Sequence, residues 1–237
     1  MKILGIDSSG MVASVAIVHD DILIAEYSVN YKKTHSQTLL PMLDEIVKMT
    51  ELDLNEIDAI AVAAGPGSFT GLRIGAATVK ALGMALDKPV VSVPTCNALA
   101  YNLWGTNKIV CPIMDARRNQ VYTGIYKFNN GRLDILHKQD AMDINELVDE
   151  LKKMDEPVIF TGDGIVVFAE LISDRLGDYA SFAPAHINRQ RAAAVATLGG
   201  VYYNDGCFEN ADEHKPIYLR KSQAEREREE RLLSGND

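Results

Sequence analysis

A glycine-rich segment at residues 65–75 constrains this chain more than any other, because it joins an apolar stretch to a long helical pattern. Residues 57–64 predict a buried strand, and residues 72–86 predict a helix with Ser68 or Thr70 as its N-cap. The first glycines can adopt positive φ and bring backbone N–H groups close to a ligand. No Gly-Lys-Ser/Thr follows, so this is not a P-loop. Spacing favours a tight turn over a loop that faces a phosphate or a partner.

The predicted helix carries a stripe of small residues. Gly71, Gly75, Val79 and Gly83 recur at intervals of four and therefore share one face. Each glycine inside a helix costs about 1 kcal/mol relative to alanine, so three of them on one face need a reason. Such a face lets another backbone approach closely. That backbone belongs either to the protein's own sheet or to a helix of a second subunit.

Composition narrows the function classes. The 237 residues are 47% hydrophobic and 24% charged, as in ordinary globular proteins of one large or two small domains. The net charge of −9 argues against a protein that holds nucleic acid alone, because phosphate binding needs clustered Lys and Arg. No apolar run approaches a membrane span, and Asp7 comes too early for a signal peptide. Three scattered cysteines fit a reducing compartment, so we expect a cytoplasmic protein.

Apolar periodicity predicts one order of elements twice. In the first half we expect strands at 2–7, 12–18, 22–29, 57–64 and 89–93, with helices at 36–49, 72–86 and 95–101. In the second half we expect strands at 109–114, 120–128, 132–141, 157–161 and 179–182, with helices at 144–154, 165–176 and 188–203. We therefore predict an α/β fold of two mixed-sheet domains, 1–106 and 107–220, whose last helix may cross back to the first domain. Residues 221–237 form a charged tail, either solvated or a docking segment.

This duplicated order is the architecture of the actin, hexokinase and Hsp70 (ASKHA) superfamily, which is built on the ribonuclease H-like fold. Residues 5–9, Gly-Ile-Asp-Ser-Ser, resemble the first phosphate loop of that superfamily. Four more segments resemble the bacterial TsaB (YeaZ) family: 35–41 (HSQTLLP), 65–75 (GPGSFTGLRIG), 115–122 (DARRNQVY) and 216–220 (PIYLR). The resemblance runs from the first residue to about residue 220.

The resemblance implies a required but non-catalytic subunit. Such proteins pair with the catalytic TsaD and the ATPase TsaE, which transfer a threonylcarbamoyl group to N6 of the adenosine next to the anticodon of ANN-decoding tRNAs. It implies that the partner subunits bind ATP and metal, and that this chain contacts tRNA only within the complex. It also implies that the chain forms a homodimer when alone. In the family the helices matching 36–49 and 71–86 form the pairing face. We expect that face to be anchored by Leu39, Leu43, Gly71, Gly75, Val79 and Gly83.

The residues themselves do not assemble a catalytic site. The catalytic relative carries two histidines four apart after the strand that matches 89–93, whereas this chain has Pro94-Thr95-Cys96-Asn97 there. The five histidines are dispersed, so we predict no bound metal. No G-x-S-x-G nucleophile motif occurs around Ser68. We therefore predict no catalytic residue.

Nucleotide binding is the open alternative. Asp7, Ser8 and Ser9 are the weak candidates for a Mg-phosphate site, with residues 161–164 placed for a second phosphate loop. Arg117 is expected to pair with Asp7 or Asp115 and fix a cleft, or to contact a nucleotide or partner. One rival function is that of a small-molecule kinase or ATPase of the superfamily. A second is that of a peptidase, although the sequence contains neither the metal-binding histidine pair nor the nucleophile motif that would support it.

Overall fold

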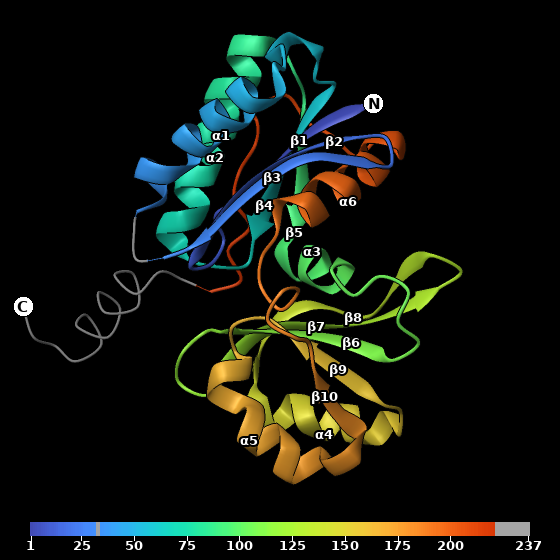
Figure 1. Ribbon diagram of the computed structural model, residues 1–237. Coiled ribbons are helices and arrows are strands. Elements are labelled where there is room, and N and C mark those ends of the chain that lie inside the picture. The colour runs from blue at the N-terminus through green and yellow to red at the C-terminus, as the bar shows by residue number, and fades with distance from the viewer. Residues whose placement is uncertain (32–33, 221–237) are drawn as a thin grey trace, which may run out of the picture.

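The computed structural model describes residues 1–31 and 34–220, and Figure 1 shows two mixed sheets, one in each half of the molecule. The first sheet has the order β3-β2-β1-β4-β5, from β1 (Lys2–Asp7), β2 (Val12–His19), β3 (Ile22–Asn30), β4 (Ala59–Gly65) and β5 (Val90–Pro94). The second has the order β10-β9-β6-β7-β8, from β6 (Ile109–Asp115), β7 (Gln120–Asn129), β8 (Arg132–Asp143), β9 (Val158–Thr161) and β10 (Ala180–Phe182).

The two sheets repeat one pairing scheme. β1 is antiparallel to β2, with Lys2 opposite His19, and parallel to β4. Likewise β6 is antiparallel to β7 and parallel to β9. In each half a three-strand meander is therefore extended by parallel strands reached through helices. This confirms the duplicated mixed-sheet fold predicted from the order of elements.

Helices cover both faces of the sheets. In the first half, α1 (His35–Thr50) and α2 (Phe69–Leu86) lie on one face. The chain returns at its end so that α6 (Ala192–Asn204) packs on β1, β2 and β4 from the other face. In the second half, α4 (Ile144–Met154) and α5 (Ile165–Leu176) lie on the outer face, and α3 (Thr95–Tyr101) lies between the halves (Figure 1). Two short 3-10 helices are η1 (Leu54–Glu56) and η2 (Gly177–Tyr179).

Local signals explain where several elements begin and end. Ser68 is the N-cap of α2, as predicted, and its Oγ accepts a hydrogen bond from Gly71 N over 3.3 Å. Asp143 caps α4 in the same way through Asn145 N. Asn130 and Gly131 both have positive φ at the turn between β7 and β8, which is the hairpin expected from the Asn-Gly pair.

Each half has its own apolar core. β4 is buried at every position because helices cover both faces of its sheet. The first core lies under α1 and α2 and includes Leu39, Leu43 and Val79. The second lies between the other sheet and α4 with α5. None of the helices in the described ranges is long and apolar enough to span a bilayer.

Buried hydrogen bonds fix the orientation of the two halves. The Tyr126 hydroxyl on β7 donates to Asn97 Oδ1 on α3 over 2.8 Å, and Asn97 Nδ2 donates to the Tyr202 hydroxyl on α6 over 2.9 Å. Gln139 on β8 reaches the first half twice, donating to Gly65 O and accepting from Cys96 N. These contacts hold the walls of the cleft described next.

Candidate functional site

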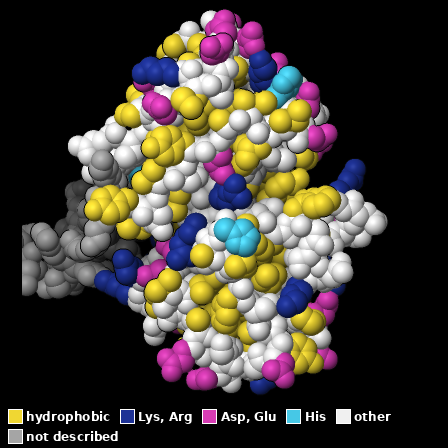
Figure 2. Space-filling view, viewed as in Figure 1, with side chains coloured by type: hydrophobic (Ala, Val, Ile, Leu, Met, Phe, Trp, Pro, Cys, Tyr) yellow, Lys and Arg dark blue, Asp and Glu magenta, His cyan; other side chains and the backbone are white. Residues whose placement is uncertain are grey.

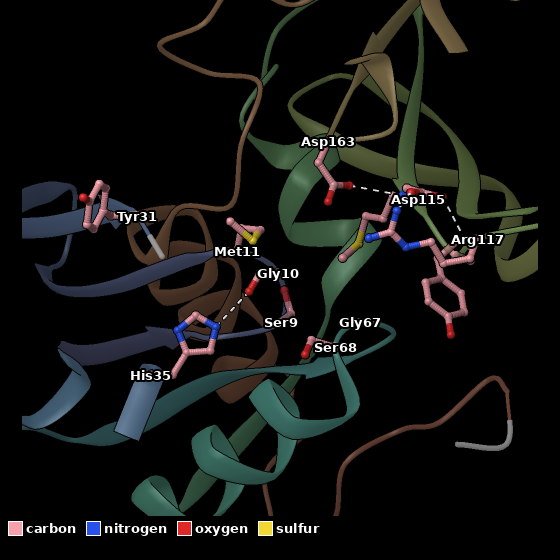
Figure 3. Close-up of a pocket in the computed structure, with 13 residues that line it drawn as sticks. Ser9, Gly10, Met11, Tyr31, His35, Gly67, Ser68, Asp115, Arg117 and Asp163 are labelled. Carbon is pink, nitrogen blue, oxygen red and sulfur yellow. Dashed lines mark hydrogen bonds and ion pairs between the residues drawn. The ribbon is translucent and has the colours of Figure 1, made fainter. Parts of the chain in front are cut away.

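An open cleft of about 510 Å³ lies where the two halves meet (Figure 3). Ser9 and Gly10 come from the β1–β2 turn and Ser68 from the start of α2. Figure 3 shows them opposite the other wall, which is formed by Asp115 and Arg117 of the β6–β7 turn and by Asp163 before α5. The cleft therefore brings residues from the predicted first phosphate loop and from residues 161–164 to one place. It also adds the β6–β7 turn as a second wall.

All three candidate residues of the β1–β2 turn make hydrogen bonds within the chain. Asp7 is buried, and its Oδ1 accepts hydrogen bonds from Ser9 N at 2.8 Å and Ser9 Oγ at 2.7 Å. Burial raises the pKa of Asp7 to about 6, although these hydrogen bonds oppose the rise. The Ser8 hydroxyl donates to the Gly71 carbonyl oxygen on α2. Of the three predicted residues only Ser9 lines the cleft.

The opposite wall is held by a short acidic and basic network. Asp115 Oδ1 accepts from Arg117 N at 2.8 Å, and Arg117 Nη1 lies 3.0 Å from Asp115 Oδ2. This confirms the predicted pair with Asp115 and leaves Asp7 out of it. Asp115 N donates to Asp163 Oδ1 over 3.2 Å, and burial raises the pKa of Asp163. The Arg117 side chain is 87% exposed, so its charge is available at the mouth of the cleft.

Comparison with known proteins decides the family. The family model described as TsaD, tRNA N6-adenosine threonylcarbamoyltransferase, matches residues 23–228. A Bacillus subtilis relative named tRNA threonylcarbamoyladenosine biosynthesis protein TsaB is 35% identical over 227 residues, covering 95% of this chain and 96% of the relative. The chain belongs to the TsaB (YeaZ) family. The Escherichia coli TsaB is 27% identical over 94% of this chain and 96% of its own length.

Solved structures agree with this assignment. A Pseudomonas aeruginosa crystal structure, described as an uncharacterized protein with similarity to peptidase YEAZ, superposes with a TM-score of 0.79. It is 26% identical, and the match covers 92% of this chain and 99% of that one. A ROK hexokinase from Thermus thermophilus matches with a TM-score of 0.53 at 13% identity, covering 86% of this chain and 100% of the hexokinase. That second likeness shows the fold alone and confirms the expected actin, hexokinase and Hsp70 architecture.

The six residues expected to anchor the TsaB pairing face do not lie on the surface. Leu39, Leu43 and Val79 are 2%, 4% and 0% exposed and belong to the first core. A helix of an amphipathic pair turns its apolar stripe toward the sheet, so these three side chains pack within the monomer. These residues are therefore not available on the surface of the monomer as the anchor that the sequence analysis expected.

The three glycines of the stripe also meet the protein's own chain. A Cβ added at Gly71 would lie 2.1 Å from Ser8 O, and one at Gly75 would lie 2.5 Å from Ser8 Oγ. At Gly83 it would lie 2.6 Å from Ala211 Cβ, in the segment that follows α6. Close packing on the monomer is thus the reason for these glycines. It was one of the two alternatives that the sequence left open.

His35 is a cleft residue whose contact the sequence did not indicate. It is the first residue of α1. Its Nε2 lies 2.8 Å from Gly10 O, and its buried Nδ1 has no hydrogen-bond partner in the described ranges. Helical periodicity places His35 at a helix end and cannot show that this end faces the β1–β2 turn. The ring therefore ties α1 to the floor of the cleft.

The described residues contain no group of three or more His, Cys, Asp or Glu side chains that could hold a metal ion. Cys96 is fully buried, and burial raises the pKa of its thiol. Thr95 beside it accepts a hydrogen bond from Gly65 N. These side chains serve the packing between α3 and the end of β4.

Proposed function

We propose that this chain is a non-catalytic cytoplasmic subunit of the assembly that adds a threonylcarbamoyl group to N6 of the adenosine next to the anticodon in ANN-decoding tRNAs. It acts by docking on the catalytic TsaD subunit and biasing it toward an active arrangement. The ATPase TsaE and TsaD handle ATP and metal, and tRNA is reached through the assembly. Membership of the TsaB family supports the pathway.

One observation carries the non-catalytic part of the proposal: Asp7 and Ser8 of the β1–β2 turn are buried and make hydrogen bonds within the chain. Asp7 is 1% exposed and accepts two hydrogen bonds from Ser9, and Ser8 donates to Gly71 O. A carboxylate that binds a metal or takes up a substrate proton must be accessible to its ligand, and the Asp7 side chain has almost no exposed surface. In this arrangement the turn supports α2 rather than a reaction.

The outward faces of α1 and α2 supply the docking surface. On α2, Arg73, Ala77 and Ala81 are exposed at intervals of four, and Met84 is 67% exposed beside them. On α1, Leu40 is 53% exposed. The two alanines in the middle of α2 allow a partner helix to approach closely. When TsaD is absent, the same face pairs two copies of this chain as a C2 dimer.

An omission experiment tests this function. Transfer of labelled threonine to tRNA is measured with TsaD, TsaE and ATP, in the presence and absence of this chain. We expect incorporation only when the chain is present, together with a TsaD complex that elutes as one species in gel filtration. Incorporation at the same rate without the chain would refute the proposed role.

The cleft itself favours a second candidate, an ATPase or small-molecule kinase. Ser9 and Gly10 face Asp115 and Asp163 across a space large enough for a nucleotide. Calorimetry of the isolated chain with ATP and Mg²⁺ separates the two functions. The proposed role predicts no micromolar binding and no turnover. Micromolar affinity with ATP hydrolysis would favour the second candidate.

A further inference from the structure

A second groove of about 440 Å³ lies between strands β2 and β3 and the loop that leads from β10 into α6. Its polar lining consists of Glu26, Ser28, Asn30, His186, Arg189, Gln190 and Arg191. Figure 2 shows a histidine near the junction of the two halves, with Lys or Arg side chains close to it. In a chain with a net charge of −9 this is a local concentration of basic groups.

The one carboxylate of the groove is fully engaged. Glu26 Oε2 accepts from Arg191 Nε over 3.0 Å and also contacts Arg191 Nη2. Its other oxygen accepts from Ala193 N at the start of α6, again over 3.0 Å. Glu26 thus neutralises Arg191 and satisfies an unpaired N–H of the helix. It leaves no carboxylate of the groove free to pair with Arg189.

Arg189 is held by three oxygen contacts and has no ion-pair partner within 4.0 Å among the residues that the structure describes. Its Nη1 donates to Gly162 O, Asn188 O and Asn188 Oδ1 at 3.2, 2.9 and 3.0 Å. Burial raises the pKa of Asp163 and the charge of Arg189 opposes that rise, but no oxygen of Asp163 lies within 4.0 Å of the guanidinium. Within the described ranges, the Nε and Nη2 donors of Arg189 have no hydrogen-bond partner. A half-buried guanidinium that has free donors and no carboxylate within ion-pair distance is stabilised when an anion binds to it.

Two further donors lie at the same place. Gln190, which lines the groove, is 2% exposed, and its amide Nε2 lies against Gly10 of the β1–β2 turn and has no hydrogen-bond partner in the part of the chain that the structure describes. His186 is exposed on the rim. Buried amide donors are almost always paired in folded proteins, so the orphan at Gln190 marks a position where a ligand or an ordered water completes the contact.

From these contacts we infer that the groove binds a phosphate group, with the guanidinium of Arg189 as the main donor and His186 at the rim. The planar fork of arginine matches two oxygens of a phosphate, and three oxygen contacts hold it in place before the ligand arrives. A phosphate has further oxygens for donors on the other side of the groove. The phosphate comes either from the backbone of tRNA in the assembled complex or from a small phosphorylated compound.

Two arms distinguish these sources. In the first, the isolated chain is titrated with inorganic pyrophosphate in a calorimeter. In the second, the complex with TsaD and TsaE is titrated with tRNA at several salt concentrations. In the arm that reports binding, Arg189→Gln is expected to weaken the affinity at least about tenfold. If the source is tRNA, the slope of log affinity against log salt falls by about 0.9 as well.

The matched control is Arg132→Gln, which removes one positive charge from the exposed end of the β7–β8 hairpin. It should leave both arms unchanged. Because Arg189 also anchors a loop, His186→Glu on the exposed rim serves as a second variant that does not threaten folding, and it should weaken binding in the same arm. The inference is overturned if neither ligand binds the wild type, or if Arg189→Gln and His186→Glu both bind as the wild type does. The pyrophosphate arm needs no partner, so its outcome is independent of the proposed docking on TsaD.

Discussion

The Ser8 hydroxyl occupies the space in which a side chain at Gly75 would begin. Ser8 Oγ donates to Gly71 O over 2.9 Å, and an added Cβ at position 75 would lie 2.5 Å from the same oxygen. The β1–β2 turn therefore packs closely on α2 because the Ser8 hydroxyl fills the space left by the absent side chain of Gly75. The glycine stripe of α2 belongs to the interior of the monomer.

Substitution at Gly75 should therefore destabilise the monomer. Gly75→Ala forces Ser8 Oγ to move and leaves it without its acceptor, so we expect a loss of about 1–3 kcal/mol in the free energy of unfolding measured with urea. The added variant Ser8→Ala makes room for the methyl group, and the double variant should be less destabilised than the sum of the two singles. Additive losses would show that the two positions do not meet as described.

Two companion variants sharpen this test. Gly71→Ala meets the backbone carbonyl of Ser8 at 2.1 Å, so its loss should be larger and Ser8→Ala should not relieve it. Ala77→Gln, on the exposed side of the same helix, should change the free energy of unfolding by less than about 0.5 kcal/mol, because glutamine is also a good helix former.

Docking should depend on the opposite side of α2. Ala81→Glu places a charge in the exposed stripe, where a partner helix must approach closely, and should weaken the affinity for TsaD at least about tenfold without lowering the melting temperature. Val166→Glu on α5, at a residue that is 77% exposed in the other half, is the control and should bind as the wild type does. Equal binding by both variants would exclude this face.

Much of the fold could be predicted from the sequence because the signals are local. α4 and α5 begin and end where they were expected, since Asp143 caps the first and Gly177 ends the second. α6 begins at Ala192 rather than at residue 188 because Arg189 and Asn188 hold an irregular loop through backbone contacts. Helical periodicity misses such an anchor because it does not report side-chain contacts, such as that of Arg189 with Gly162, which is distant in the chain.

The site was less predictable for a related reason. Periodicity shows that Gly71, Gly75 and Gly83 share a face, but it does not show what that face meets. Ser8 and Ala211 are the partners, and both are distant in sequence. Similarly, the β6–β7 turn with Asp115 lies opposite Ser9 only because the two halves are fixed by contacts such as Tyr126 to Asn97. The pairing of Arg117 with Asp115 could be predicted because the residues are neighbours in the chain.

Asp7 gives the folding equilibrium a defined pH dependence. Burial raises its pKa to about 6 in the folded protein, against 3.8 for an ordinary aspartate. The folded state therefore binds the proton of the Asp7 carboxyl more tightly than the unfolded state does. The stabilisation that protonation gives the folded state is complete below pH 4 and is lost as the pH rises through 6. The free energy of unfolding of the wild type minus that of Asp7→Asn should therefore fall by on the order of 2 kcal/mol between pH 4 and pH 7. A difference that does not change over this range would contradict the burial of Asp7.

Asn97 should be important for the connection between the two halves. Removing it with Asn97→Ala leaves the buried Tyr126 hydroxyl without its acceptor, which should cost about 1–3 kcal/mol in urea unfolding. Adding Tyr126→Phe removes the orphaned hydroxyl, so the double variant should recover part of the loss. A double variant that is worse than the sum of the singles would show that the contact is not direct.

The central claim, that the chain acts by docking on TsaD, is tested most directly by the rate of threonylcarbamoyl transfer to tRNA. The rate is measured with TsaD, TsaE and one of three forms of this chain: the wild type, Asp7→Asn or Ala81→Glu. If the chain acts by docking alone, Asp7→Asn supports transfer at the wild-type rate and Ala81→Glu reduces the rate to that of the reaction without the chain. A loss of transfer in Asp7→Asn while its complex with TsaD still forms, or full transfer with Ala81→Glu, would contradict the account.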